Sequence, residues 1–402
     1  MKKIVVLGAG FAGMKAVVEL QKKVRGEAEI TLVDRNPYHM ETIRLYEVAS
    51  GENPYTKMSY PVNDVINPKV TKFIQDEVLR VNYTEKKVEL ANHAPLNYDY
   101  CIIGLGFTLD NLGIDGVKEN ALPMYNVKTA QAIYNHISNN MKDYRETKDE
   151  KDLHIVICGA GFQAVELANA MAMARDRFAK MAGVSKNDIK ITMLDGSNPK
   201  FFLPMFGDKQ TNYALKKIHE NGIEILSNAH ITRVFSDSVY YTVDDEEKKV
   251  DSNNLIWFTG FSGSDVISAS RFNERRNRVM VSEHLTAPES DDVYVLGDVS
   301  SVMVPGKNYP LPNTGQLAVS MGEYAAKDLA ARVLGHARPN PYKYNDLGVV
   351  VDLGKSAVGL AMSLKVYGWF GMAMKRLIID KSIMDTGGFK ETFAIGRFDF
   401  LG

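Results

Sequence analysis

The chain has 402 residues, a formal net charge of −1 and a hydrophobic content of 45%. This length is enough for two or three domains with their own cores, and the near-neutral balance excludes a general electrostatic attraction for nucleic acid. The two cysteines, Cys101 and Cys158, each lie in an apolar stretch, which predicts buried thiols in a reducing compartment, and no cysteine or histidine spacing is typical of a metal site.

The opening stretch predicts a dinucleotide-binding unit. An apolar run over Ile4–Leu7 is typical of a buried parallel strand. Glycines follow in the spacing G-x-G-x-x-G: Gly8, Gly10 and Gly13. The first permits the tight turn, the second lets the backbone approach a pyrophosphate, and the third lets the helix over 14–22 pack on the strand. The next strand, over 29–33, ends in Asp34, whose carboxylate can accept hydrogen bonds from a ribose.

The stretch after Asp34 is expected to cover the mouth of this nucleotide site. Residues 41–49 have a helical pattern, and Tyr38 and His39 before them either line the site or pack within an ordinary loop. A further buried strand within 98–106 ends in Gly-Leu-Gly. Such a strand can return to the sheet and bring its glycines against the cofactor.

The opening pattern recurs further along the chain. A charge run over 145–152, expected to be a solvated connection, leads into an apolar strand over 153–158. The accepted variant G-x-G-x-x-A follows, with its small residues at Gly159, Gly161 and Ala164. After a helix, a strand over 189–194 ends in Asp195. Two such units on one chain predict two nucleotide sites, with hydride transfer between a tightly bound dinucleotide and an exchanging one.

Two carboxylates of the second unit bear on its chemistry. Asp195 favours the free 2′-hydroxyl of NADH, and residues 196–198 offer no arginine for the 2′-phosphate of NADPH. Glu166 is placed in the first turn of the second helix. There it is either stabilised by the helix dipole, or it points at the nicotinamide or its redox partner and handles protons.

Two later strands are predicted to close the two units. Residues 255–260 repeat the design of 100–106, an apolar strand followed by glycine. Residues 293–298 form a strand that ends in Asp298. A carboxylate at that point can bind the ribityl hydroxyls of a flavin.

The order of these motifs, with GAGFAG, GLG, GAGFQA, FTG and VYVLGD, resembles the flavoprotein reductases with two dinucleotide-binding domains over about residues 1–335. That resemblance implies FAD at the first unit and NAD(P)H at the second. The helix over 38–50 holds no cysteine, unlike disulfide reductases, NADH peroxidases and water-forming oxidases, and the two strand cysteines do not supply those of sulfide:quinone reductases. The chain is most similar to the type II NADH dehydrogenases, single-subunit NADH:quinone oxidoreductases.

Residues near the C-terminus support that subfamily. The segment over 310–322 is similar to the family's A-Q-x-x-x-Q sequence before a helix, with Gln316 at the first glutamine and Ser320 in place of the second. In the family both glutamines border the quinone pocket. Glu166 matches the glutamate of the family's second fingerprint, and Lys375 matches a lysine close to the flavin. The helix that begins near Gln316 can aim its N–H groups at the flavin N1–C2=O edge.

Residues 341–402 are not a third nucleotide unit. A hairpin is predicted around 354–356, followed over 363–381 by a helical stretch that does not suit a transmembrane span but suits an interfacial helix. Its aromatic Trp369 and Phe370 would add apolar burial. Four cations favour an anionic membrane surface: Lys365, Lys375, Arg376 and Lys381. The alternative is that this face packs on the core or on another subunit; in the family the region anchors the enzyme to the membrane and contributes to dimerisation.

The predicted fold is α/β, with two Rossmann-like domains and a C-terminal membrane-associating region. The FAD-binding domain is assigned to 1–114 and 285–340, the NADH-binding domain to 115–284, and the C-terminal region to 341–402. Residues expected at FAD are Gly8, Gly10, Phe11, Ala12, Gly13, Asp34, Arg35, Val78, Gly106, Asp298, Gln316 and Lys375. Those expected at NADH are Gly159, Gly161, Phe162, Glu166, Asp195 and Gly260. Those expected to take part in catalysis are Glu166, Gln316 and Ser320.

The predicted function is that of a FAD-dependent, non-proton-pumping NADH:quinone oxidoreductase, with menaquinone as the expected acceptor. The expected setting is a peripheral homodimer on the cytoplasmic face of the cell membrane. Two alternatives stay open. A soluble reductase of a small redox protein such as ferredoxin would not need the basic, apolar C-terminal helix, and Ser320 leaves room for an NADH-sensing flavoprotein with a long-lived charge-transfer state.

Overall fold

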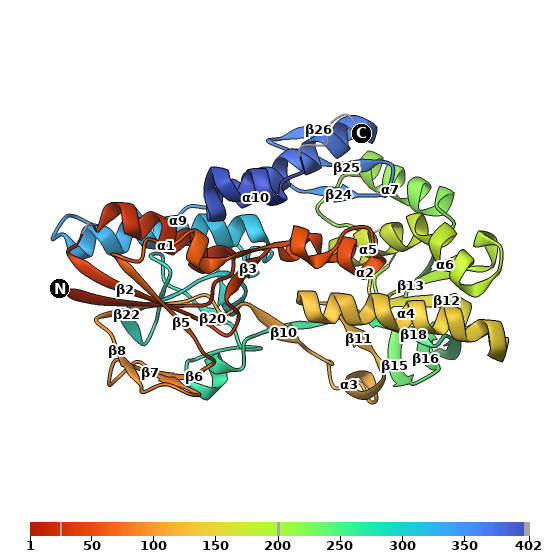
Figure 1. Cartoon of the computed structure of the whole chain (residues 1–402), viewed down its shortest axis with the longest axis horizontal. Coiled ribbons are helices and arrows are strands. Elements are labelled where there is room, and N and C mark those ends of the chain that lie inside the picture. The colour runs from red at the N-terminus through yellow and green to blue at the C-terminus, as the bar shows by residue number, and fades with distance from the viewer. Residues whose placement is uncertain (25, 199–201, 398–402) are drawn as a thin grey trace.

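The computed structural model describes residues 1–24, 26–198 and 202–397, which form two α/β lobes side by side with a C-terminal layer above them (Figure 1). The first lobe contains the N-terminus and the second contains the middle of the chain. This arrangement confirms the predicted mixed α/β class, because each lobe is built on its own mainly or wholly parallel sheet.

The sheet of the first lobe has six strands in the order β21-β22-β9-β1-β2-β5. Their bounds are Thr286–Ala287 for β21, Ser290–Val295 for β22, Tyr100–Ile103 for β9, Lys2–Leu7 for β1, Ala28–Asp34 for β2 and Thr71–Gln75 for β5. All neighbours pair in parallel except β21, which pairs antiparallel with β22. The apolar runs of the central strands are buried on both faces, as expected of a parallel sheet.

Two helices of the first lobe pack closely on each other. Helix α1 spans Phe11–Lys23, and α9 spans Gly315–Val333 from the far end of the chain. A Cβ on Gly322 of α9 would lie 2.3 Å from the carbonyl oxygen of Ala12 in α1. Only glycine therefore allows this approach, which holds α9 against the helix that follows the first glycine turn.

The second lobe repeats the design with a parallel sheet in the order β11-β18-β12-β13-β14. Its strands are Leu122–Pro123 for β11, Asn254–Trp257 for β18, His154–Cys158 for β12, Lys190–Asp195 for β13 and Glu224–Ser227 for β14. Its helices are α3 at Val117–Asn120, α4 at Val127–Thr147, α5 at Phe162–Met173, α6 at Arg175–Ala182 and α7 at Asp208–Glu220. Cys101 and Cys158 lie buried in the two central sheets, and burial raises the pKa of both thiols.

Smaller sheets complete the two lobes and join them. Strands β10 and β19 pair antiparallel where the chain passes between the lobes, at Phe107–Leu109 and Phe261–Gly263. Other short strands of the lobes are β3 at Tyr38–Met40, β4 at Ser59–Pro61, β6 at Val78–Asn82, β7 at Lys87–Leu90, β8 at Leu96–Asn97, β20 at Val279–Met280 and β23 at Ser300–Ser301. Two short helices accompany them, α2 at Leu45–Ser50 and α8 at Val266–Ala269. The second lobe also carries a three-stranded antiparallel meander of β15, β16 and β17, over His230–Phe235, Ser238–Val243 and Glu246–Asp251.

The charge run at 145–152 is mostly exposed, as predicted for a solvated connection, but its last residue is not. Helix α4 continues to Thr147, and Asp152 is buried. Its carboxylate accepts hydrogen bonds from Asn253 at 2.7 Å and from Thr147 at 3.1 Å. Asp152 thus connects the end of α4 with the residue before β18, a contact that the charged composition of the segment did not indicate.

The C-terminal layer consists of a three-stranded sheet and a long helix. Strands β24, β25 and β26 span Val350–Asp352, Ala357–Ala361 and Leu364–Tyr367, which confirms the predicted hairpin and adds a third strand. Helix α10 spans Gly368–Ile395, with a break at Gly388 where φ is +77°. The predicted helical stretch was wrong at its start, since Lys365 pairs with Leu360 as part of β26.

Candidate functional site

The first glycine turn stands at the carboxyl end of β1. The Gly8 N–H donates to Val33 O at 2.8 Å, and a Cβ on Gly8 would lie 2.3 Å from Gly104 O. A Cβ on Gly13 would lie 1.8 Å from Gly8 O, so this glycine is required by the packing of α1. At Gly10, by contrast, the nearest heavy atom lies 3.9 Å away. The protein itself leaves room for a side chain at Gly10, as expected where a ligand approaches the backbone.

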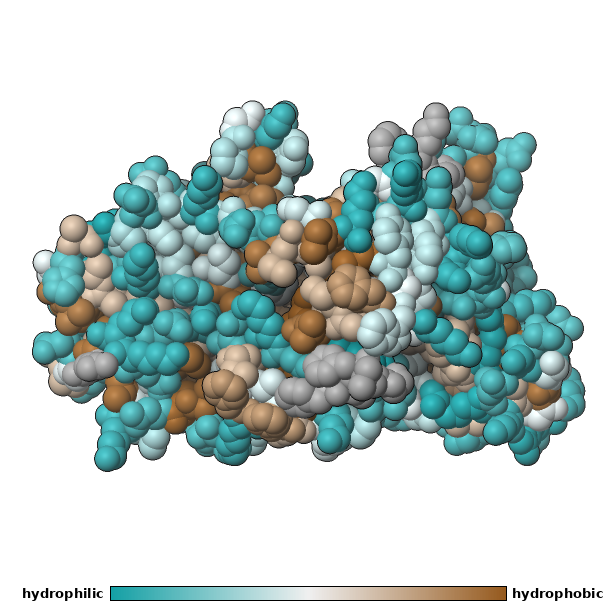
Figure 2. Space-filling view, turned by 90° about the horizontal axis from the view of Figure 1, so that it is seen from above, coloured by the Kyte–Doolittle hydropathy of each residue, from teal (hydrophilic) through white to brown (hydrophobic). Residues whose placement is uncertain are grey.

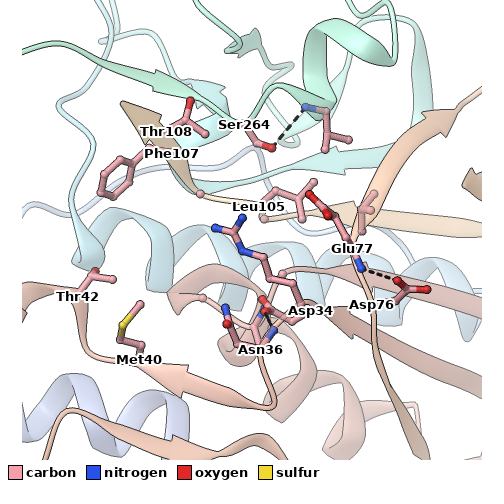
Figure 3. Close-up of a pocket in the computed structure, with 18 of the residues that line it drawn as sticks. Asp34, Asn36, Met40, Thr42, Asp76, Glu77, Leu105, Phe107, Thr108 and Ser264 are labelled. Carbon is pink, nitrogen blue, oxygen red and sulfur yellow. Dashed lines mark hydrogen bonds between the residues drawn. The ribbon is translucent and has the colours of Figure 1, made fainter. Parts of the chain in front are cut away.

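A cavity of about 190 Å³ opens beside this turn (Figure 3). Segments that follow the carboxyl ends of β1, β2, β5 and β9 line it, which is where ligands bind in open α/β sheets. The lining includes these predicted residues: Gly8, Gly10, Asp34, Arg35, Val78 and Gly106. It also includes Tyr38 of β3 and Ser264. Phe11 and Ala12 instead pack α1 against α9, with a Cβ on Gly315 lying 3.3 Å from the Phe11 ring.

Asp34 holds the turn in shape from the end of β2. Its carboxylate accepts the N–H of Ala9 at 2.7 Å and the N–H of Asn36 at 2.7 Å. Burial raises the pKa of Asp34, and these two hydrogen bonds oppose that shift. The carboxylate thus lies at the cavity within hydrogen-bonding distance of the glycine turn, where a ribose diol would meet it.

Asp76 is a cavity residue that the sequence analysis missed. Its carboxylate accepts hydrogen bonds from His93 Nδ1 at 2.6 Å and from the backbone N–H groups of Asn92 and His93 at 3.0 and 2.9 Å. Although burial opposes ionisation, these bonds hold the pKa of Asp76 well below its usual range. Asp76 therefore fixes the turn that carries Val78 to the cavity, and no local motif announces such a long-range contact.

Asp298 follows β22 in the first lobe. Burial raises the pKa of its carboxyl, and the nearby Arg278 guanidinium opposes that shift. Its backbone oxygen accepts a hydrogen bond from Arg278 Nε at 3.2 Å, but within the described ranges no group donates to its carboxylate. A desolvated carboxylate without a donor suits a ligand that carries hydroxyl groups, so the residues present fit a flavin with its ribityl chain.

The first turns of α9 carry the two predicted positions Gln316 and Ser320. Thr314 caps the helix by accepting the Leu317 N–H at 3.1 Å. The Gln316 amide accepts the N–H of Leu347 at 2.8 Å and donates to Gly348 O at 3.3 Å. Ser320 Oγ accepts the hydroxyl of Tyr342 at 3.1 Å. Both side chains thus contact the segment that leads from α9 to β24.

The second glycine turn repeats the first at the carboxyl end of β12. The Gly159 N–H donates to Leu194 O at 2.8 Å, and its φ is +125°. No heavy atom lies within 4 Å of a Cβ built on Gly161. Asp195, at the end of β13, accepts the N–H of Ser197 at 2.9 Å and its hydroxyl at 2.7 Å. Gly260 has a φ of +78°, and a Cβ built on it would lie 2.7 Å from Asp110 O.

Phe162 and Glu166 lie on α5, which begins at Phe162. The rings of Phe162 and Phe206 pack together, with 5.5 Å between their centroids. Because the helix begins there, Glu166 lies in its second turn, and the prediction of a first-turn position was wrong. Glu166 is 4% exposed and lies within 2.7 Å of Lys375 Nζ, on α10. The carboxylate therefore connects the second lobe to the C-terminal layer.

Lys375 was also counted among the cations of an exposed basic face, and that prediction was wrong. Lys375 is 9% exposed and pairs with Glu166. Glu166 also accepts the Asp352 N–H at 3.0 Å, and the Tyr46 hydroxyl donates to the Asp352 carboxylate at 3.3 Å. Burial raises the pKa of Asp352 to about 7, and the Glu166 charge adds to this shift. The two acids and the lysine form a buried group in which a proton can be held or moved near neutral pH.

Stability should depend on pH through Asp352. Because the pKa of Asp352 is raised in the folded state, its protonated carboxyl contributes to the stability of the fold. That contribution is fully present below the pKa of an exposed aspartate, about 4, and is lost as the pH rises through about 7. We expect the wild-type Tm to fall between pH 5 and pH 8 by about 2–4 °C more than that of Asp352→Asn. Thermal unfolding across that range tests this expectation, and parallel curves for the two proteins would contradict it.

His39 does not line the cavity, whereas its neighbour Tyr38 does. The His39 ring is fully buried, with Nδ1 2.8 Å from Ala9 O and Nε2 3.3 Å from the Glu41 carboxylate. Ser382 of α10 donates to the other oxygen of Glu41 at 3.2 Å. His39 therefore supports the glycine turn from behind and connects it with the C-terminal helix.

Known proteins resemble this chain over nearly its whole length. A family model described as pyridine nucleotide-disulphide oxidoreductase matches residues 2–322. The chain is 33% identical over 401 residues to the type II NADH:quinone oxidoreductase of Staphylococcus haemolyticus, which covers 99% of each protein. The protein of the same name from Staphylococcus aureus strain NCTC 8325 matches with the same identity and coverage.

Solved structures show the same fold. The NDH2 of Plasmodium falciparum, solved in complex with NADH, matches with a TM-score of 0.85 and 18% identity, covering 98% of this chain and 97% of that one. The sulfide:quinone oxidoreductase of Aquifex aeolicus matches with a TM-score of 0.77 and 18% identity, covering 96% and 92%. The pairing of two lobes with a C-terminal layer is thus shared by proteins of very different sequence.

Proposed function

This chain belongs to the type II NADH:quinone oxidoreductases, within the pyridine nucleotide-disulphide oxidoreductase family, and on that premise we propose that it oxidises NADH with the help of FAD and reduces a membrane quinone. The observation that carries the proposal is the duplicated glycine turn. Each lobe places one at the carboxyl end of a central parallel strand, and in each the middle glycine is left uncrowded by protein atoms.

We assign FAD to the first lobe, within residues 1–114 and 285–340. The turn at Gly8 and Gly10 and the N-terminus of α1 would hold its pyrophosphate, Asp34 its ribose and Asp298 its ribityl hydroxyls. Val78, Arg35 and Gly106 line the same cavity as Gly8, Gly10 and Asp34, whereas Asp298 is not among its lining residues. When bound, FAD accepts a hydride from NADH and delivers two electrons to the quinone. The N-terminal N–H groups of α9 would favour negative charge on the ring edge that they face.

We assign NADH to the second lobe, within residues 115–284. The turn at Gly159 and Gly161 would hold its pyrophosphate, and Asp195 would accept hydrogen bonds from the adenosine ribose. Phe162 and Gly260 lie at the same end of this sheet. The chain's part in hydride transfer is to hold the two rings in contact and exclude water.

We assign the quinone, with menaquinone as the expected compound, to the region of the first turns of α9. Gln316 and Ser320 lie there and contact the segment that precedes β24. Glu166 and Lys375 would hold and donate the protons that quinone reduction consumes, with Asp352 beside them. A Ser320 hydroxyl in place of a glutamine amide is expected to leave more room at the quinone ring.

We further propose that residues 341–402 bind the membrane surface at the cytoplasmic face and contribute to a homodimer. Several apolar side chains of this region are exposed, which favours burial against lipid or another subunit: Met362, Leu364, Trp369, Phe370, Leu377, Phe389 and Phe393. Apolar side chains gather over the middle of the face on which α10 lies (Figure 2). No helix within residues 1–24, 26–198 and 202–397 is long and apolar enough to cross a membrane.

Anaerobic stopped-flow measurements on the flavin-loaded protein test the activity. NADH is expected to bleach the flavin absorbance, and a menaquinone analogue mixed in second is expected to restore it within about a second, well inside the usual range of turnover rates. Bleaching without restoration by any quinone would contradict the proposed acceptor. Restoration by a small redox protein instead would favour the soluble reductase, and a persistent charge-transfer band would favour the NADH sensor.

Nucleotide preference should follow Asp195. The double variant Asp195→Ser/Ser197→Arg removes the carboxylate and adds a cation where the 2′-phosphate of NADPH would lie. We expect kcat/KM for NADH to fall about 10- to 100-fold, as for the loss of hydrogen bonds to a charged group, and kcat/KM for NADPH to rise. The control is Asp176→Ser, an exposed acid on α6, which should leave both values unchanged. An unaltered ratio in the double variant would contradict the assignment of Asp195.

A further inference from the structure

A second cavity, of about 330 Å³, lies under the C-terminal layer and apart from the glycine turns. Its walls come from the end of α2, the junction of α5 and α6, the turn between β24 and β25, and α10. The charged residues that line it are Arg177, Lys355, Arg376, Arg397, Glu52 and Asp352. At this size the cavity suits a small ligand or headgroup.

The charge balance of this cavity favours an anion. Four cations face two carboxylates, and Asp352, with its pKa raised to about 7, carries only part of a negative charge near neutral pH. Arg397 lies within 3.0 Å of the Glu47 carboxylate and 3.7 Å of Glu52, so part of its charge is already balanced. Arg177 of α6, Lys355 of the β24–β25 turn and Arg376 of α10 come from three different parts of the chain and line the same cavity.

Two of these cations have donors to spare. The Arg177 guanidinium donates through Nη2 to Ser50 O and lies over the rings of Tyr134 and Phe178, but its buried Nε has no hydrogen-bond partner. Lys355 is exposed at the tip of the β24–β25 turn and forms no ion pair with any residue in the described ranges. Buried guanidinium donors without acceptors are uncommon in folded proteins. They are satisfied when an anion with several oxygens enters.

The cavity also adjoins the exposed apolar face of α10. Met372 and Arg376 line the cavity, while Trp369 and Leu377 on the same helix are 61% and 48% exposed. Residues three and four apart on a helix are neighbours, so the exposed Trp369 lies beside Met372, which in turn lies beside Arg376. An amphiphile could therefore place an anionic group in the cavity while its apolar part lies against the outer face of α10.

We propose that this cavity binds the phosphate of an anionic phospholipid headgroup, with Arg177 and Lys355 as its principal donors. This inference rests on the proposed membrane association and goes beyond it. It replaces a diffuse attraction between basic residues and the membrane with a defined site formed by the second lobe, the hairpin and α10 together. The same oxygens could come from a soluble phosphate, but the adjacent apolar face favours a lipid.

Vesicle co-sedimentation of the flavin-loaded protein tests the proposal. Phosphatidylcholine vesicles are compared with the same vesicles containing phosphatidylglycerol, for the wild type and for the variants Arg177→Gln and Lys355→Gln. The matched control is Lys180→Gln, which removes one exposed cation from the same helix as Arg177 without touching the cavity. We expect phosphatidylglycerol to strengthen the binding of the wild type to vesicles. In each cavity variant the affinity for these vesicles should be about fivefold lower than in the wild type, the usual effect of one cation near an anionic surface.

The outcomes separate the site from membrane association itself. An equal loss in Lys180→Gln would indicate a diffuse field and overturn the site. Calorimetric binding of inorganic phosphate that depends on Arg177, without any gain from phosphatidylglycerol, would overturn the lipid assignment. A wild type that ignores all vesicles would overturn the membrane association too, while NADH:quinone activity would stand. Lys355→Gln serves if Arg177→Gln fails to fold, because Lys355 is exposed and forms no ion pair with the residues that the structure describes.

Discussion

Replacing Glu166 by glutamine is expected to slow flavin reoxidation by quinone about 100-fold, the lower end of what a positioned acid or base contributes, while leaving FAD bound. The substitution preserves the shape of the side chain and its bond to the Asp352 N–H, but it removes the charge that pairs with Lys375 at 2.7 Å. Stopped-flow measurement of both half-reactions locates the effect. If Glu166 also positions the nicotinamide, flavin reduction by NADH should slow as well.

The pH profile of this variant provides a readout that a purely structural role would not move. Because the Glu166 charge helps to raise the pKa of Asp352, its removal should lower the pH at which the rate of quinone reduction changes. The control is Asp328→Asn, which changes another buried carboxylate, near the C-terminal end of α9. The Asp328 carboxylate pairs with Arg338 at 2.6 Å and accepts the Tyr294 hydroxyl at 2.7 Å. This substitution should cost stability, as loss of one partner of a buried pair does, without altering the pH profile. Unchanged rates in both half-reactions of Glu166→Gln would reject the proposed role.

The second large effect is expected from single alanine substitutions in the first glycine turn. In Gly13→Ala the new Cβ would meet Gly8 O at 1.8 Å, so α1 must move and the lobe should be strongly destabilised. In Gly10→Ala the nearest protein atom is 3.9 Å away, so the fold should stay intact. A methyl group there nevertheless occupies the space assigned to the pyrophosphate. We expect Gly10→Ala to weaken FAD binding about 100-fold, or about 2.7 kcal/mol.

Fluorescence titration of the apoprotein with FAD, together with thermal unfolding without cofactor, separates these two effects. Gly161→Ala is the matched variant in the second turn, where no heavy atom lies within 4 Å of the added carbon. It should leave FAD affinity and stability unchanged and raise KM for NADH. If Gly10→Ala bound FAD as tightly as the wild type, or if Gly161→Ala lost FAD instead, the assignment of the two lobes would be wrong.

Much of the fold could be predicted from the chain in order. Both glycine turns, the acids Asp34 and Asp195, and the returning strands that end in glycine were identified from local patterns, and the structure places them at corresponding points of two parallel sheets. The two turns even share a backbone bond, since Gly8 and Gly159 each donate to the neighbouring strand at 2.8 Å. Such features are predictable because they depend on short-range sterics and on the spacing of apolar residues.

Other parts of the candidate site depend on residues that are far apart in the chain. Nothing near Lys375 in the sequence indicates that it pairs with Glu166, and composition placed it on an exposed basic face instead. The same applies to Asp76 with His93 and to Asp352 beside Glu166.

The sequence by itself thus determined that this protein has two dinucleotide-binding units and which residues form their turns. Only the tertiary structure decided which charges are buried together and which cations remain at the surface. The physical reason is that a glycine turn is specified by the conformations of adjacent residues, whereas the state of a buried charge is set by whatever the whole fold packs against it.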